Sequence, residues 1–192
     1  MVITIGLIIK AGGQIVAVVI PLYKYFTKDL KTTGVKILAE DLGKIDDALT
    51  YIFENTKADR FILFFGTNGW GKMKYATAIL ERHKKNDKSK GAVNKFVKLN
   101  VDAHYLGLIK KAESFGVVEL QVLKMGVGDL KNIYLSEGIW HSKIYFLLRK
   151  KNTFFKHHIF YCSFATHSKI AFTSYEKILI RGKIEILKSI IK

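Results

Sequence analysis

The feature that most constrains the fold is an almost uncharged segment near the start of the chain. Residues 2–23 read VITIGLIIKAGGQIVAVVIPLY and contain one charge, Lys10, and one side-chain amide, Gln14. As a helix this segment would span about 33 Å, which is enough to cross the hydrocarbon core of a bilayer. The sequence therefore predicts a hydrophobic N-terminal helix that anchors the protein in a membrane. A helix packed in the protein core or in an assembly is the alternative.

The flanks of this segment predict its orientation. No basic stretch precedes it and no small-x-small cleavage site follows, which disfavours a cleaved signal peptide. Lysines come directly after it, at Lys24, Lys28, Lys31 and Lys36. Because cytoplasmic flanks are rich in Lys and Arg, we expect a single-pass membrane protein with its C-terminal domain in the cytoplasm. Residues 1–31 would form the anchor and its juxtamembrane stretch, and residues 32–192 the folded domain.

The composition excludes several classes of protein. The chain has 192 residues, of which 49% are hydrophobic and 25% charged, so it is neither disordered nor of low complexity. A single cysteine, Cys162, excludes a disulfide framework and a Cys-rich zinc module. It lies in the apolar run IFYCSFA and is expected to be a small core residue.

Motifs for catalysis are also missing from the sequence. GTNGWGK lacks the spacing of a phosphate-binding P-loop, and there is no His-Glu-x-x-His. His157 and His158 are adjacent on an expected strand, so they point to opposite faces and cannot chelate one ion together. We therefore expect no catalytic residue, no metal site and no cofactor, and hence no enzyme.

A helix is expected over residues 35–56, because apolar residues recur there at alternating spacings of three and four. The stripe includes Leu38, Leu42, Ile45 and Leu49. It packs either on a sheet of the same chain or against a second copy in a short parallel coiled coil. Fewer than three heptads favour the first alternative, whereas the second would make these four residues a homodimer seam.

The rest of the sequence predicts mainly strands. Phe61–Phe65 is a continuous apolar run of strand length, which is typical of a central strand buried on both faces. Thr67-Asn68-Gly69 is a turn signal, so the next strand, residues 73–80, would complete a hairpin. Further strands are expected at 117–125, 139–148, 158–165 and 170–175, with a helix from Asn100 or Asp102 to Phe115. Residues 126–138 are expected to form a loop with a short helical turn. Residues 176–192 suit either a closing helix, which we prefer, or a hairpin.

This order of elements predicts an α+β domain, with an antiparallel sheet of five to six strands and helices on one face. Two short motifs flank the first expected strand, Ala58-Asp59-Arg60 before it and Phe65-Gly66-Thr67-Asn68-Gly69 at its end. With these motifs and this order of elements, the chain resembles the GAF domain, a relative of PAS sensor domains, of the kind found behind an N-terminal membrane segment in small phage and bacterial proteins. The resemblance implies ligand sensing or dimeric signalling, which the fold alone does not establish.

Two tryptophans and an asparagine are the candidates for a ligand pocket. Trp70 and Trp140 lie beside glycines at expected strand boundaries, where an aromatic side chain lines a pocket or closes the core from its rim. Asn68 precedes Gly69 and is most simply a turn residue with positive φ.

The positive charge suggests an anionic partner, either nucleic acid or anionic lipid. The net charge is +16, and most of the excess lies in residues 72–98 and 143–192. The candidate contacts are Lys84, Lys85, Lys88, Lys90, Arg149, Lys150 and Lys151. Two functions follow as expectations. One is a membrane-anchored, non-enzymatic GAF-like module that binds a ligand or a protein partner. The other is a structural component of a phage or virion whose basic loops contact nucleic acid or lipid.

Overall fold

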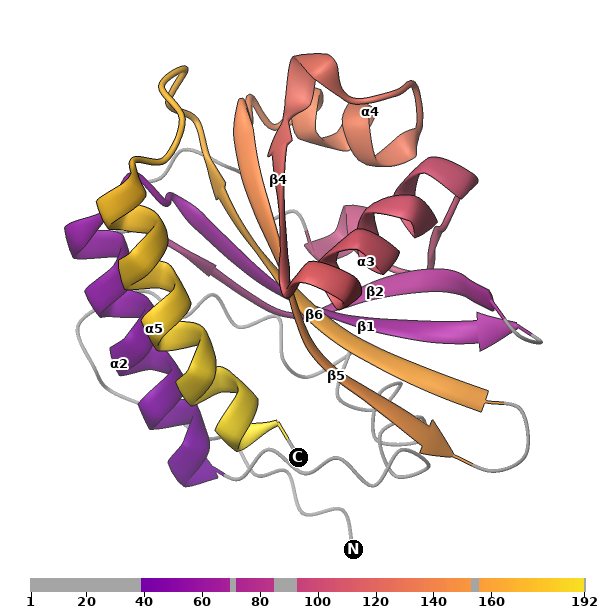
Figure 1. Cartoon of the computed structure of the whole chain (residues 1–192), viewed down its shortest axis with the longest axis horizontal. Coiled ribbons are helices and arrows are strands. Elements are labelled where there is room, and N and C mark those ends of the chain that lie inside the picture. The colour runs from indigo at the N-terminus through magenta and orange to yellow at the C-terminus, as the bar shows by residue number, and fades with distance from the viewer. Residues whose placement is uncertain (1–38, 70–71, 85–92, 153–155, 192) are drawn as a thin grey trace, which may run out of the picture.

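The structure is a computed structural model that describes residues 39–69, 72–84, 93–152 and 156–191. Its centre is a six-stranded antiparallel sheet with the strand order β3-β2-β1-β6-β5-β4 (Figure 1). The strands are β1 (Arg60–Gly69), β2 (Lys72–His83), β3 (Leu99–Asn100), β4 (Val117–Gln121), β5 (His141–Asn152) and β6 (Lys156–Thr166). The predicted α+β class and antiparallel sheet are confirmed.

Strand β1 lies at the centre of the sheet and is buried on both faces, as its apolar run predicts. Phe61, Leu63 and Phe65 point to one face, whereas Ile62 and Phe64 point to the other. The two strands beside it, β2 and β6, are both antiparallel to it. A strand buried in this way needs a cover on each side of the sheet.

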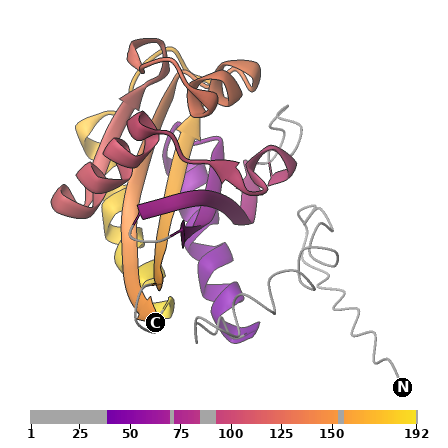
Figure 2. The same ribbon diagram turned by 90° about the vertical axis from the view of Figure 1, so that its right-hand side faces the viewer.

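Helices provide that cover on both faces, so the prediction of helices on one face is wrong. The helices α2 (Ala39–Asn55) and α5 (Ser174–Ile190) lie side by side over Phe61, Leu63 and Phe65. The helices α3 (Ala103–Phe115) and α4 (Asp129–Ser136) pack over the opposite face (Figure 2). We call this opposite side the α4 face.

The second helix on the α4 face is longer than predicted. For residues 126–138 the sequence predicts a loop with a short helical turn, and eight of these residues form α4, with Leu130 and Tyr134 buried against the sheet. A helix this short shows only two turns of apolar spacing, which is too little to fix its length from the sequence.

The closing helix is confirmed and the strand predicted over residues 170–175 is wrong. Thr173 is the N-cap of α5, and its hydroxyl accepts a hydrogen bond from the Glu176 backbone N–H. The Glu176 carboxylate in turn accepts one from the Thr173 backbone N–H, which completes a capping box. This cap starts a helix where β-branched and aromatic residues suggested a strand.

The hairpin of β1 and β2 is confirmed, although its predicted turn is displaced. Asn68 lies in β1 opposite Met73, and Gly69 lies opposite Lys72. Asn68 is therefore a strand residue. At its other end β2 continues to His83, three residues beyond the predicted end of that strand.

The predicted helix that ends at Phe115 is confirmed as α3. Asp102 is its N-cap and accepts from the Tyr105 N–H at 2.7 Å, while Gly116 ends it with a φ of 79°. Gly128, just before α4, lies so close to the Asp102 carboxylate that a Cβ there would overlap it. The two helices on the α4 face therefore share this contact.

Gly128→Ala is expected to destabilise the protein by about 1 kcal/mol, because the added methyl displaces the carboxylate that caps α3. Gly107→Ala, within α3, is the control. A Cβ at Gly107 meets nothing within 4 Å, so that change should stabilise the helix by up to about 1 kcal/mol. Urea unfolding measures both variants. Equal effects of the same sign would contradict the prediction.

The predicted membrane anchor, residues 2–23, lies outside the described residues. Among the residues that the structure does describe, no helix is both long and apolar enough to cross a bilayer.

Candidate functional site

The most unusual side chain of the α4 face is an arginine at the start of β1. Arg60 alternates with Phe61 and so points to the same face as Ile62 and Phe64. Its exposed fraction is 0%, and it is among the largest fully buried side chains of the domain. Across the described ranges, none of its three guanidinium nitrogens has a hydrogen-bond partner. A buried guanidinium is expensive unless it is paired and hydrogen-bonded.

An aromatic ring and a carboxylate lie next to the Arg60 guanidinium. The Tyr134 ring of α4 lies under it, with 5.8 Å between the guanidinium carbon and the ring centroid, which is a cation–π contact. The Glu137 carboxylate, at the end of α4, is 4.0 Å from Nη1, too far for a hydrogen bond.

Glu137 is shared between two cations. Its side chain is 5% exposed, and its Oε1 pairs with the Lys95 ammonium, which is itself 44% exposed. Lys95 also donates to Ser136 Oγ at 3.3 Å. Arg60, Lys95 and Glu137 therefore form a charged cluster in which two cations face one carboxylate.

Buried hydroxyls continue the polar surface from this charged cluster along the α4 face. Tyr134, Ser142 and Ser163 form a hydroxyl cluster with oxygen–oxygen distances of 2.8, 3.1 and 3.3 Å. Strand register places it beside Arg60, because Arg60 and Ser142 are both paired with Ala165 of β6.

A second hydroxyl pair lies on the same face. The Tyr105 and Tyr161 hydroxyls are 2.6 Å apart. Burial raises the pKa of Tyr105, and the neighbouring Tyr161 and Tyr134 raise it further. Burial also raises the pKa of Tyr161, more than its hydrogen bond with Tyr105 lowers it. Both tyrosines are therefore neutral hydrogen-bonding groups.

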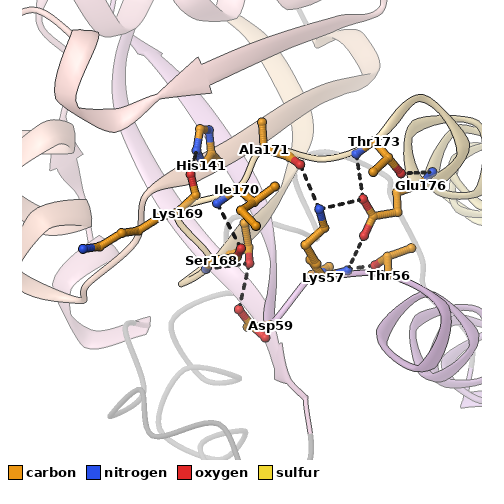
Figure 3. A network of polar contacts seen from close by, with 12 residues as sticks. Thr56, Lys57, Asp59, His141, Ser168, Lys169, Ile170, Ala171, Thr173 and Glu176 are labelled. Atoms are coloured by element: carbon orange, nitrogen blue, oxygen red, sulfur yellow. Dashed lines mark hydrogen bonds and ion pairs between the residues drawn. The ribbon is translucent and has the colours of Figure 1, made fainter.

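The start of β1 is fixed by a polar network that ties it to the segment between β6 and α5 (Figure 3). Asp59 Oδ2 accepts from the Thr166 hydroxyl at 2.9 Å and from the His167 N–H at 2.8 Å. Glu176 accepts from the Lys57 N–H at 2.8 Å. His167 Nε2 lies 3.0 Å from the Glu137 carbonyl oxygen, so the network also reaches the end of α4.

The three predicted pocket residues do not come together in the described structure. Trp140 is half-buried just before β5, and the Lys169 ammonium lies 5.3 Å from its ring centroid. Asn68 lies at the far end of β1 from Arg60, and Trp70 lies outside the described residues. Whether any of the three contacts a ligand stays a prediction.

The basic candidates are described only in part. Arg149 forms a bidentate pair with Glu113, both distances being 2.6 Å. Lys84 is half-buried and donates to the Thr56 carbonyl at 3.3 Å. Lys150 is half-buried in β5, and only the backbone position of Lys151 is described. The remaining candidates, Lys85, Lys88 and Lys90, lie outside the described residues.

Most of the described helix stripe faces the sheet of the same chain. Ile45 and Leu49 are buried in the core against β1, β6 and α5, so they are not free to form a homodimer seam. Leu42 is 39% exposed, and Leu38 lies outside the described residues. The homodimer itself stays a prediction.

From the sequence, Arg60 stands out only as part of the Ala58-Asp59-Arg60 motif before the first strand. One signal for its burial is that a charged residue directly precedes a run that is buried on both faces. Side chains alternate along a strand, so the charged side chain then also points into the core. That signal is ambiguous without α4, since Arg60 at the first position of its strand would reach solvent if no helix covered it.

Comparison with known proteins supports the fold. No protein-family model and no curated protein sequence matches the chain. Among solved structures, it is similar to the GAF domain of a two-component sensor histidine kinase from Bacillus halodurans. The TM-score is 0.54 at 8% identity, over 81% of this chain and 95% of that one.

Two further structures agree. A GAF domain/HD domain protein from Geobacter sulfurreducens has a TM-score of 0.50 at 12% identity, over 84% of this chain and 94% of that one. The chromophore-binding domain of a bacteriophytochrome from R. palustris has a TM-score of 0.51 at 10% identity, over 86% of this chain and 58% of that one. At these identities the comparisons establish fold and nothing beyond it. The described part of the chain has a GAF-like fold.

Proposed function

We propose that the protein is a non-enzymatic binding module that takes a small ligand on the α4 face of its sheet. The observation that carries the proposal is Arg60, a fully buried cation whose guanidinium nitrogens have no hydrogen-bond partner in the described structure. Polar groups that converge on an otherwise apolar interior are typical of ligand sites. One of the structures similar in fold is a chromophore-binding domain, which agrees with a binding role for this architecture.

The proposal includes a membrane anchor formed by residues 2–23, with the GAF-like domain on the cytoplasmic face. The alternative is a phage or virion component that contacts nucleic acid or anionic lipid through its basic loops. It has less support, because Arg149 is already paired with Glu113 and Lys84 already donates to a backbone carbonyl.

Ligand-observed NMR with a fragment library tests the binding role on the full chain. Two matched variants locate the site. Tyr105→Phe removes a buried hydroxyl from the α4 face, whereas Tyr145→Phe removes one from the face covered by α2 and α5. We expect fragments whose binding weakens in Tyr105→Phe and is unchanged in Tyr145→Phe. A library without such a fragment would contradict the proposal.

Membrane attachment is tested separately by fractionation with an alkaline wash. The full chain should remain in the pellet, whereas a version that starts at Thr32 should be released. Release of both would contradict the anchor and leave the binding role unaffected.

A further inference from the structure

The Arg60 guanidinium has five N–H donors in a fixed plane, and the described protein leaves them without acceptors. Arginine is suited to planar, bidentate recognition of carboxylate and phosphate oxygens. The same group in a structural role would be expected to bind its carboxylate directly. Arg149 does so, with two parallel hydrogen bonds to Glu113. Glu137 does not give Arg60 this arrangement, because its nearer oxygen stays 4.0 Å from Nη1.

The charges around Arg60 also favour an anion. Lys95 already pairs with one oxygen of Glu137, so this single carboxylate faces two cations. Glu81, another acid on this side of the sheet, lies opposite Ile62, and its Oε1 is 2.9 Å from His83 Nε2. Lys95 is partly exposed and therefore hydrated, whereas Arg60 is not. The cation that lacks a closely paired counter-charge is therefore Arg60.

Neutral donors lie next to this cation. The Tyr134 ring lies under the guanidinium, and the Tyr134 hydroxyl joins those of Ser142 and Ser163. Hydroxyl hydrogens rotate, so any of the three can donate to a bound oxygen in place of its present partner.

We infer that Arg60, with Tyr134 beside it, is the anchor for an oxyanion group, a carboxylate or a phosphate, on the ligand of the α4 face. The inference rests on the proposed function and adds the chemical class of the ligand. The anion would accept a pair of guanidinium hydrogen bonds, and the neighbouring hydroxyls would satisfy its remaining oxygens.

Inorganic phosphate and acetate are the probes, titrated against thermal unfolding of the full chain. Sodium chloride keeps the ionic strength constant. Saturation of the effect separates binding at a site from the general stabilisation that phosphate gives to proteins. We expect a saturable rise in Tm for the wild type with at least one of the two anions. The anion with the lower apparent Kd identifies the source as phosphate or carboxylate.

Three variants make the result specific. Arg60→Met should abolish the saturable rise, and Arg60→Lys, which keeps the charge but loses the planar fork, should weaken the apparent Kd by about tenfold or more. Arg149→Met, which removes an arginine from the partly exposed pair with Glu113, should leave it unchanged. If Arg60→Met does not fold, Arg60→Lys and the wild type still decide the matter.

The outcomes against the inference are equally definite. No saturable rise in the wild type would overturn it, and so would an apparent Kd that Arg60→Lys leaves unchanged. A neutral fragment that binds the α4 face while neither anion binds would overturn the ligand class and leave the proposed function standing. Failure of the fragments and of both anions would overturn the two together.

Discussion

Glu137→Gln is expected to lower the free energy of unfolding by about 3 kcal/mol. The carboxylate is the counter-charge that lies 4.0 Å from the buried Arg60 guanidinium, so its loss leaves a buried cation beside the Tyr134 ring without an acidic neighbour at that distance. Removing one member of a buried ion pair typically costs about 3–5 kcal/mol. We use the lower end of that range because the closest approach is 4.0 Å without a hydrogen bond. Urea unfolding of the full chain measures the change.

A double-mutant cycle shows whether the loss comes from Arg60. Adding Arg60→Met to Glu137→Gln removes the stranded cation, and we expect about half or more of the lost stability to return. Glu113→Gln is the control, because its pair with Arg149 is partly exposed and should cost at most about 1 kcal/mol. A Glu137→Gln variant within about 1 kcal/mol of the wild type would show that the carboxylate does not stabilise Arg60.

The second large effect is expected at Glu176, which joins α5 to the start of β1. Its carboxylate accepts from the backbone N–H groups of Lys57 and Thr173 and lies 3.4 Å from the Lys57 ammonium. Glu176→Ala leaves two N–H donors without their acceptor and removes half of the capping box. We expect a loss of about 2–4 kcal/mol, since hydrogen bonds to charged groups are worth about 1.5–3 kcal/mol each.

Glu185→Ala is the matched control on the same helix. Among the described residues its carboxylate pairs with Lys188 alone, on the exposed side of α5, so the loss should stay below about 0.5 kcal/mol. Chemical unfolding of both variants provides the comparison. Equal losses would contradict the structural role of Glu176.

The same contacts make part of the stability depend on pH. Burial raises the pKa of Glu176, but its hydrogen bonds from Thr173 and Lys57 and the Lys57 charge outweigh burial and hold the pKa below the usual value of 4.5. The folded state therefore binds this proton less readily than the unfolded state. The contribution is complete above about pH 4.5 and is lost as the pH falls through the lowered value. The pH dependence of stability in Glu176→Gln should accordingly be flatter as the pH falls below about 4.5.

The parts of the fold that could be predicted are those with long periodic signals. Phe61–Phe65 predicted a central strand buried on both faces, and Asp102 with Gly116 bounded a helix correctly. The error of helices on one face arose because apolar spacing locates a helix such as α3 along the chain but does not show which face of the sheet it covers. A strand buried on both faces already required a second cover, so the two predictions were in conflict.

The candidate site was harder to predict, because it depends on contacts between residues far apart in the sequence. Arg60, Lys95 and Glu137 come from β1, a 3₁₀ turn (Val93–Phe96) and the end of α4, and no local pattern links them. Lysines and tryptophans attract attention in the sequence as exposed charge and as aromatic rings. That an arginine is buried can be recognised only when the helix that covers it is known.

The antiparallel pairing of α2 and α5 has a mechanical consequence. The end of α2 meets the start of α5 near Lys57 and Glu176, so the start of α2 and the end of α5 lie together at the opposite end of the pair (Figure 1). A force that pulls on these two ends would load the helix pair at one end only. The helices would then peel apart turn by turn, and the six-stranded sheet would carry tension only after they had separated.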